Sequence, residues 1–163
     1  MRRSDREIKD RQEIIDVIGK CDVCRIALND DGYPYIVPLN FGMREEDGTV
    51  VFYFHGAKEG KKYDLIRRDN RASFEMDCGH KLFLEEERGN CTMTYECVMG
   101  RGRIEIVPDE EKEEALILLM EHYRSADFPF NRAVIPMTTV FKLVVEEMTG
   151  KRRAKKMPAL KEK

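Results

Sequence analysis

Short apolar stretches alternate with polar turns along the chain, and this pattern predicts an α+β protein built mainly from strands. Stretches rich in β-branched and aromatic residues end in Asn, Asp or Gly, which is typical of strands joined by hairpin turns. Such strands pair antiparallel. We therefore expect a mainly antiparallel β-barrel, closed or split, with helices at its periphery. About six strands are expected, over residues 23–28, 33–41, 49–54, 72–77, 92–107 and 140–145.

Three further segments carry the periodicity of amphipathic helices. Ser4 and Glu7 form a capping-box pattern, which predicts a helix from there to Gly19. A short helix is expected over residues 61–68. A third helix begins at Pro108–Asp109, because acidic residues fill its first turn and an apolar side follows. The polar segments 79–90 and 125–137 are expected to be irregular.

Two of the predicted strands contain residues that disturb a regular ladder. Pro34 and Pro38 cannot donate backbone hydrogen bonds, so the strand over 33–41 is expected at a sheet edge or with a bulge. Gly100 and Gly102 predict a bulge or bend in the strand over 92–107. No repeat or linker divides the chain, so residues 1–150 are expected to form one domain.

Charge is distributed unevenly along the 163 residues, whose formal net charge is −2. Residues 151–163 hold seven Lys or Arg and one Glu, a net +6, which leaves −8 on the preceding residues. We expect this segment to be a flexible, solvated tail and not a nucleic-acid site, because the acidic body would repel a phosphate backbone. The N-terminus has no apolar run of the signal-peptide kind, and no stretch is long enough to span a bilayer. A cytoplasmic protein without a membrane partner is expected.

The five cysteines change this picture little. Cys21 and Cys24, taken with Cys78 and His80, supply four ligands of the kind that zinc prefers. The spacing of the second pair is unusual for such a site, however, and Cys24 falls in a predicted strand. Cys21 and Cys24 also lack the thioredoxin-like context of a redox couple. We therefore expect free thiols and no metal.

The segment His55-Gly56-Ala57-Lys58-Glu59-Gly60-Lys61-Lys62 is the first candidate for chemistry. It follows an apolar strand and opens a helix. Free backbone N–H groups at a helix start, the helix dipole and a nearby lysine together make a phosphate site. The glycine spacing does not match a Walker A loop. Taken alone, an ordinary solvated loop explains the segment better than a phosphate site does.

The proline-interrupted strand Tyr35-Ile36-Val37-Pro38-Leu39-Asn40-Phe41 is the second candidate. Its free N–H and C=O groups can pair with the edge of a flat heterocycle instead of another strand. Alternatively, the prolines only protect an edge strand against aggregation. Taken alone, the second interpretation is favoured.

Together these segments resemble the pyridoxamine-phosphate-oxidase-like flavoprotein superfamily, and within it the nitroimidazole-resistance (nitroreductase-like) branch. The resemblance covers nearly the whole chain, and it depends on the order and spacing of motifs that are individually loose. These motifs are Tyr33-x-Tyr35-x-Val37-Pro38-Leu39-x-Phe41, His55-x-Ala57-x-x-Gly60-x-Lys62, Tyr95-Glu96-Cys97-Val98-x-Gly100-x-Gly102-Arg103-Ile104, Pro108-Asp109-x-x-Lys112-x-x-Ala115-Leu116, and the ending Glu146-Glu147-Met148-Thr149-Gly150-Lys151.

The resemblance implies a split-barrel homodimer with one FMN in each of two clefts at the subunit interface. It puts the Pro38–Asn40 backbone along the isoalloxazine edge and His55, the candidate catalytic residue, near the ring or the ribityl chain. Lys62, helped by Lys61, would neutralise the phosphate, and Thr94 and Tyr95 would approach the cofactor from one subunit or the other. The implied cofactor-binding residues are Val37, Pro38, Leu39, Asn40, His55, Gly56, Ala57, Gly60, Lys61, Lys62, Thr94, Tyr95 and Cys97.

Cys97 is a departure, since this branch more often has Ser there, and a thiol is a poor substitute for a hydroxyl donor. The implied function is an FMN-dependent oxidoreductase that passes electrons from a reduced nicotinamide through FMN to a small substrate such as a nitroaromatic. A non-catalytic flavin-binding or sensing protein is the alternative. No His stands in the C-terminal tail to bind a haem.

Overall fold

The computed structural model describes residues 3–123, 129 and 131–154. Four short 3₁₀ turns accompany the regular elements, at Ser4–Arg6, Glu86–Arg88, Asp109–Glu111 and Arg132–Met137. The helices are α1 (Arg11–Ile18), α2 (Lys61–Arg68) and α3 (Lys112–His122). The strands are β1 (Glu7–Ile8), β2 (Cys24–Leu28), β3 (Tyr35–Leu39), β4 (Gly42–Glu46), β5 (Thr49–Gly56), β6 (Arg71–Glu85), β7 (Asn90–Ile106) and β8 (Thr139–Arg153).

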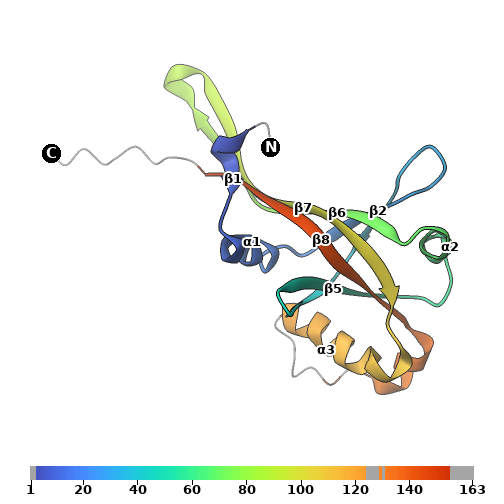
Figure 1. The fold of residues 1–163 in the computed structure, drawn as a ribbon. Helices are drawn as coiled ribbons and strands as arrows, with labels where there is room; N and C mark the ends of the chain where they lie inside the picture. The colour runs from blue at the N-terminus through green and yellow to red at the C-terminus, as the bar shows by residue number, and fades with distance from the viewer. Residues whose placement is uncertain (1–2, 124–128, 130, 155–163) are drawn as a thin grey trace.

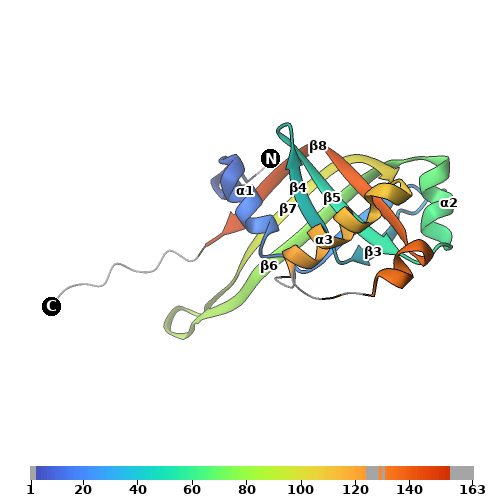
Figure 2. The same ribbon diagram turned by 90° about the horizontal axis from the view of Figure 1, so that it is seen from below.

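The strands form one antiparallel sheet in the order β3-β2-β6-β7-β8-β5-β4, and β1 pairs with β8 (Figures 1 and 2). The sheet curls without closing, because β3 and β4 are its two edges. The expected α+β class and split antiparallel barrel are therefore confirmed, with eight strands in place of about six. The two strands that the sequence did not predict are the two-residue β1 and the short β4.

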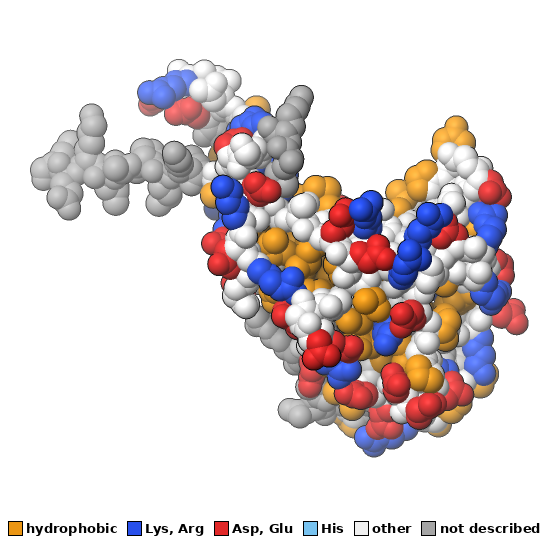
Figure 3. All heavy atoms as spheres, in the orientation of Figure 1, with side chains coloured by type: hydrophobic (Ala, Val, Ile, Leu, Met, Phe, Trp, Pro, Cys, Tyr) orange, Lys and Arg blue, Asp and Glu red, His pale blue; other side chains and the backbone are white. Residues whose placement is uncertain are grey.

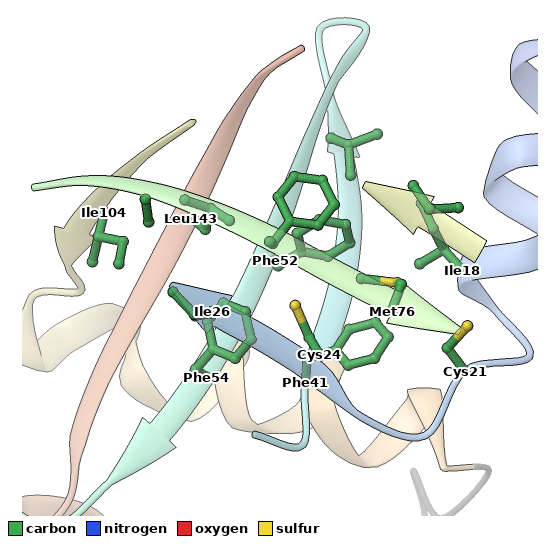
Figure 4. Packing of buried hydrophobic residues seen from close by; sticks show 14 of the residues in the cluster. Ile18, Cys21, Cys24, Ile26, Phe41, Phe52, Phe54, Met76, Ile104 and Leu143 are labelled. Carbon is green, nitrogen blue, oxygen red and sulfur yellow. The ribbon is translucent and has the colours of Figure 1, made fainter. Parts of the chain in front are cut away.

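Phenylalanine rings fill the inside of the curled sheet (Figure 4). Phe52 packs edge-on against Phe41 and Phe74, with ring centroids 5.6 Å and 5.1 Å apart. Burying one such side chain contributes roughly 1.5–3 kcal/mol. On the opposite side of β5, Val51 and Tyr53 pack with Ala115 of α3. β5 is therefore buried on both faces, as its apolar sequence predicted.

The predicted N-terminal helix starts later than expected. α1 begins after Asp10, whose carboxylate accepts a hydrogen bond from the backbone N–H of Glu13 at 3.1 Å. Ser4 lies in a 3₁₀ turn instead, and Ile8 pairs with Gly150 of β8. Burial of the Ile8 side chain in the core favours this pairing over another helical turn.

The segment 79–90, expected to be irregular, continues the hairpin of β6 and β7. A register shift between Cys78 and Lys81 interrupts the pairing, which then resumes as far as Glu85 and Asn90. Gly79 and Gly89 have φ values of 69° and 63°, which glycine adopts without strain. We call residues 80–95 the arm, because this part of the hairpin projects beyond the rest of the sheet (Figure 1).

Two features of β7 and β8 complete the comparison with the sequence. A register shift between Arg101 and Gly102 confirms the predicted bulge. β8 continues to Arg153, so residues 151–153 are part of the sheet and not of a tail. Arg152 pairs with Glu13 at 2.5 Å and with Glu96. The rest of the expected tail, residues 155–163, lies outside the described residues.

The other expectations concern helices, loops and cysteines. α3 follows Asp109–Glu111 as predicted, and Arg132–Met137 forms a 3₁₀ turn in the segment expected to be a loop. Residues 124–128 of that segment lie outside the described residues. None of the described helices has both the length and the apolar character needed to cross a membrane. All five cysteines are free thiols, and the described residues contain no group of ligands arranged to hold a metal.

Candidate functional site

The end of β5 and the start of α2 bring the predicted phosphate residues together. β5 ends at Gly56, which pairs with Thr139 of β8, and Gly60 precedes the first turn of α2. Gly60 has a φ of 143°, which other residues rarely adopt. No side chain of the described residues caps this helix start. The Tyr63 N–H donates to the Gly60 carbonyl at 3.0 Å, so the N–H groups of Lys61 and Lys62 are the ones open to an anion.

Lys61 and Lys62, adjacent in sequence, have different surroundings. Lys61 forms an ion pair with Asp30 at 2.6 Å and lies 5.1 Å from the centroid of the Tyr35 ring. The ammonium of Lys62 lies 4.4 Å from the centroid of the Tyr63 ring. Within the part of the chain that the structure describes, no carboxylate lies within ion-pair distance of Lys62. Of these two lysines, Lys62 is therefore the one without an acidic partner among the described residues.

Gly56 lies directly against the side chains of Lys62 and Tyr63. A Cβ atom at position 56 would lie 2.8 Å from the Tyr63 hydroxyl and 3.0 Å from the Lys62 ammonium. The Tyr63 hydroxyl is buried and makes no hydrogen bond to any described residue. The Thr139 side chain approaches it, without hydrogen-bond geometry. Burial raises the pKa of Tyr63, so its hydroxyl keeps its proton and can donate it to an acceptor.

His55 lies one residue before Gly56, with its side chain exposed. Desolvation by the surrounding protein lowers the pKa of this imidazole, and the positive charge of Lys62 lowers it further. His55 is therefore neutral at pH 7, with one ring nitrogen to donate a hydrogen bond and one to accept it.

β3 lies beside these residues and forms one edge of the sheet. Its alternation directs Val37 and Leu39 inward, where they line a narrow recess together with Lys62. The recess has no room for a water molecule, and its other walls are apolar. Pro38 points outward. Asn40 donates hydrogen bonds of 3.1 Å to the Asp22 carbonyl and the Tyr123 hydroxyl, which fixes the end of the strand.

Thr94, Tyr95 and Cys97 do not join this group within one chain. They lie on β7 toward the arm, at the opposite end of the sheet from α2 (Figure 1). The Thr94 hydroxyl donates to the Gly79 carbonyl at 3.1 Å, and the Tyr95 hydroxyl accepts from Arg6 at 3.4 Å. Cys97 is buried, and burial raises the pKa of its thiol. The structure thus divides the predicted site into two parts.

Tyr63 is the residue that the sequence analysis missed. It occupies an apolar position of α2, so its pattern indicates a core residue, and the ring is indeed buried. The adjacent Lys62 could have pointed to Tyr63, because a phosphate site needs neutral hydrogen-bond donors beside the cation.

Comparison with known proteins identifies the family of the chain. Residues 10–152 match the family model described as pyridoxamine 5'-phosphate oxidase. The chain belongs to this family. No curated protein matches the sequence.

Solved structures from the family's fold superpose closely. A candidate 5-nitroimidazole antibiotic resistance protein from Bacteroides thetaiotaomicron is 34% identical, with a TM-score of 0.77 over 90% of this chain and 86% of that one. The flavocytochrome Anf3 from Azotobacter vinelandii is 18% identical (TM-score 0.77, 95% and 72%). An FAD- and haem-binding protein from Mycobacterium smegmatis is 17% identical (TM-score 0.76, 92% and 74%). The first of these, together with the family model, confirms the resemblance seen in the sequence.

Proposed function

We propose that this pyridoxamine 5'-phosphate oxidase family member binds FMN beside β3 and the start of α2. The observation that carries the proposal is Lys62, whose ammonium has no carboxylate partner among the described residues although Lys61 beside it is paired. An unpaired, half-buried cation at an uncapped helix start is suited to a phosphate. The structural neighbours described as a flavocytochrome and as an FAD- and haem-binding protein support a flavin ligand.

The residues present fit such a cofactor. Lys62 would neutralise the phosphate, and the open N–H groups after Gly60 would donate to its oxygens. The buried Tyr63 hydroxyl lacks an acceptor among the described residues, and a bound anion would supply one. Because Gly56 has no side chain, the Lys62 ammonium and the Tyr63 hydroxyl can lie directly against its backbone. The backbone around Pro38 and the neutral His55 remain for the flavin ring and ribityl chain.

The proposed reaction is an oxidoreduction in which a reduced nicotinamide donates electrons that pass through FMN to a small substrate. FMN supplies the electron-transfer chemistry when it is bound. The protein binds and orients it, and His55 is the group available to exchange a proton at neutral pH. A nitroaromatic is the proposed substrate class, supported by the 34% identical candidate 5-nitroimidazole resistance protein. A cytoplasmic location is part of the proposal.

A homodimer is also proposed, with the cofactor at the interface. Support comes from the division of the predicted site, since Thr94, Tyr95 and Cys97 lie far along β7 from Lys62 in a single chain. A second copy would bring the two groups of residues to the same cofactor.

The test is a visible spectrum and a fluorescence titration of the purified protein with FMN. Lys62→Ala should weaken FMN binding by about 10- to 100-fold, as expected for a charge-assisted contact of roughly 1.5–3 kcal/mol. The matched control Lys61→Ala should change it less than about threefold, because Lys61 already pairs with Asp30. A protein that stays colourless and does not bind added FMN would overturn the proposal.

Reduction of the bound flavin separates the two functions left open. If NADH or NADPH bleaches the flavin and a nitroaromatic restores its colour, the protein is an oxidoreductase. If the flavin is bound but neither nicotinamide reduces it, the proposed electron donor is wrong, and the sensing or storage alternative takes its place.

A further inference from the structure

The proposed site has a cation for the phosphate of FMN, whereas the flavin ring needs neutral groups. The edge of the oxidised ring is uncharged and carries one N–H, at N3, between two carbonyl oxygens. A neutral hydrogen-bond acceptor is therefore the group that recognises this N–H. Acidic and basic side chains are interspersed over the face shown in Figure 3, so charge does not mark where the ring would lie. A neutral side chain near β3 with an unused acceptor is the feature that matters.

The corner between β3 and β4 is fixed to α3 at each of its three residues. A Cβ atom at Gly42 would lie 2.5 Å from the backbone of α3, so only glycine fits there. The Phe41 ring packs against His122, with ring centroids 4.2 Å apart. The Asn40 side chain donates a hydrogen bond to the hydroxyl of Tyr123, the residue that follows α3, at 3.1 Å. Because α3 packs on β5 (Figure 2), the corner is held by a helix that the sheet itself supports.

The Tyr123 hydroxyl connects three groups, and their chemistry sets the direction of each hydrogen bond. The Asp22 carbonyl can only accept, so the hydroxyl donates its single proton there, at 2.7 Å. The hydroxyl therefore accepts from the backbone N–H of Phe41 at 3.2 Å and from the amide of Asn40. These contacts use its one proton and both lone pairs. Tyr123 thus ties the end of β3 to the Asp22 backbone.

The same network fixes which way the Asn40 amide faces. Its nitrogen lies 3.1 Å from the Asp22 carbonyl and 3.1 Å from the Tyr123 hydroxyl. The reversed amide would place two carbonyl oxygens against each other at Asp22, so the nitrogen must be the atom on this side. No donor among the described residues reaches the Asn40 Oδ1, and the side chain is exposed. Asn40 therefore presents an unused acceptor.

Asn40 also lies at the edge where the phosphate residues are found. Leu39, the residue before it, lines the narrow recess together with Lys62. Pro38 is exposed, as Asn40 is. A flavin held by its phosphate at Lys62 and lying along β3 would thus meet the fixed acceptor of Asn40.

We propose that the Asn40 Oδ1 accepts a hydrogen bond from the N3–H of the flavin ring, and that Tyr123 positions Asn40 for this contact. The inference rests on the FMN binding proposed above. Because the amide is held in place before the ligand arrives, the contact costs little side-chain entropy. A flavin without this hydrogen leaves the fixed acceptor without a donor, so the site distinguishes flavins by the N3 hydrogen.

The test compares FMN with 3-methyl-FMN, in which a methyl group replaces the N3 hydrogen, by fluorescence titration. The wild type should bind 3-methyl-FMN about three- to tenfold more weakly than FMN. Asn40→Ala should bind the two flavins about equally, because it lacks both the acceptor and the side chain that would meet the methyl group. Lys62→Ala should weaken the binding of both flavins to the same degree and keep their affinity ratio.

Tyr123→Phe isolates the positioning role. The change removes one of the two hydrogen bonds that hold the Asn40 amide, so the affinity ratio of the two flavins should fall at least about twofold. Tyr53→Phe is the matched control, because it removes another partly buried hydroxyl, which is hydrogen-bonded to Glu46 at 2.5 Å. The control should leave the ratio unchanged. Thermal unfolding verifies that each variant is folded, and a general defect of the fold would weaken both flavins equally.

The possible failures differ from one another in this experiment. A wild type that binds both flavins equally well would overturn the role of Asn40 and leave the proposed FMN binding intact. An affinity ratio that is unchanged in Tyr123→Phe would overturn the positioning role of Tyr123. If the wild type binds neither flavin, the proposed function fails, and the inference fails with it.

Discussion

The α2 end of the sheet and the arm meet solvent in different ways. At the α2 end, the Lys62 ammonium has no carboxylate partner and the Tyr63 hydroxyl has no hydrogen bond among the described residues, and both pack against Gly56. In the arm, the large apolar side chains of Leu82, Leu84 and Met93 are exposed, and only the hairpin itself supports them. The first end is suited to a small anion and the second to another protein surface. The same two strands, β6 and β7, thus connect a region with unpaired polar groups to one with exposed apolar side chains.

Thiol reactivity gives the largest expected contrast between the arm and the body. Cys91 is exposed on the arm, whereas Cys24 is fully buried and burial raises its pKa to about 12. At pH 8 and at concentrations where the chain is monomeric, Cys91 should react with a maleimide more than about a thousandfold faster than Cys24. Peptide mass spectrometry measures both rates. Equal rates would mean that the body opens as readily as the arm.

A pair of truncations compares the energies of the two regions. Phe52→Ala should lower the free energy of unfolding by about 3–5 kcal/mol, because it leaves a cavity between Phe41 and Phe74. Leu84→Ala should change it by less than about 0.5 kcal/mol at concentrations where the chain is monomeric, since Leu84 is exposed. Urea unfolding measures both. A large effect of Leu84→Ala in the monomer would show that the arm already packs against its own body.

The sequence predicted the body better than it predicted the arm, for a physical reason. Residues 49–54 carry a long apolar run that only a strand buried on both faces explains, and β5 is such a strand. Residues 79–90 are polar and interrupted by glycine, and they become strands only through pairing with β7 after the bulge at Gly79. Strand formation here depends on the partner strand, and it leaves little trace in the composition of either segment.

The candidate site was predicted unevenly for the same reason. Lys62 and Gly60 were found because a helix start after a strand is a local pattern. The Tyr63 hydroxyl was not predicted as part of the site, because its lack of a hydrogen bond among the described residues depends on what surrounds it in space. The distance along β7 that separates Thr94 and Tyr95 from Lys62 also required the fold.

Tyr63→Phe tests whether the polar groups of the α2 end await a ligand. The change removes a buried hydroxyl that has no partner among the described residues, so the free energy of unfolding of the flavin-free protein should stay the same or rise slightly. FMN binding should weaken by about 0.5–1.5 kcal/mol, or roughly two- to tenfold. Unchanged or higher stability without FMN, combined with weaker FMN binding, would indicate a hydroxyl whose partner is the cofactor. A loss of stability without FMN would mean that the hydroxyl already has a partner in the free protein.

The smallest effect concerns the titration of His55 beside Lys62. Desolvation first and the Lys62 charge second hold the pKa of His55 below its ordinary value of about 6.5. The unfolded chain therefore takes up this proton more readily, so the contribution of His55 to stability is complete above pH 6.5 and is lost as the pH falls through its lowered pKa. Because the side chain is exposed, the change in stability is small, and an NMR titration of the imidazole is the sharper measurement. In Lys62→Met the pKa of His55 should rise but remain below the ordinary value, since desolvation persists. If the pKa of His55 is unchanged in that variant, the Lys62 ammonium does not lie close enough to His55 for its charge to act on the imidazole.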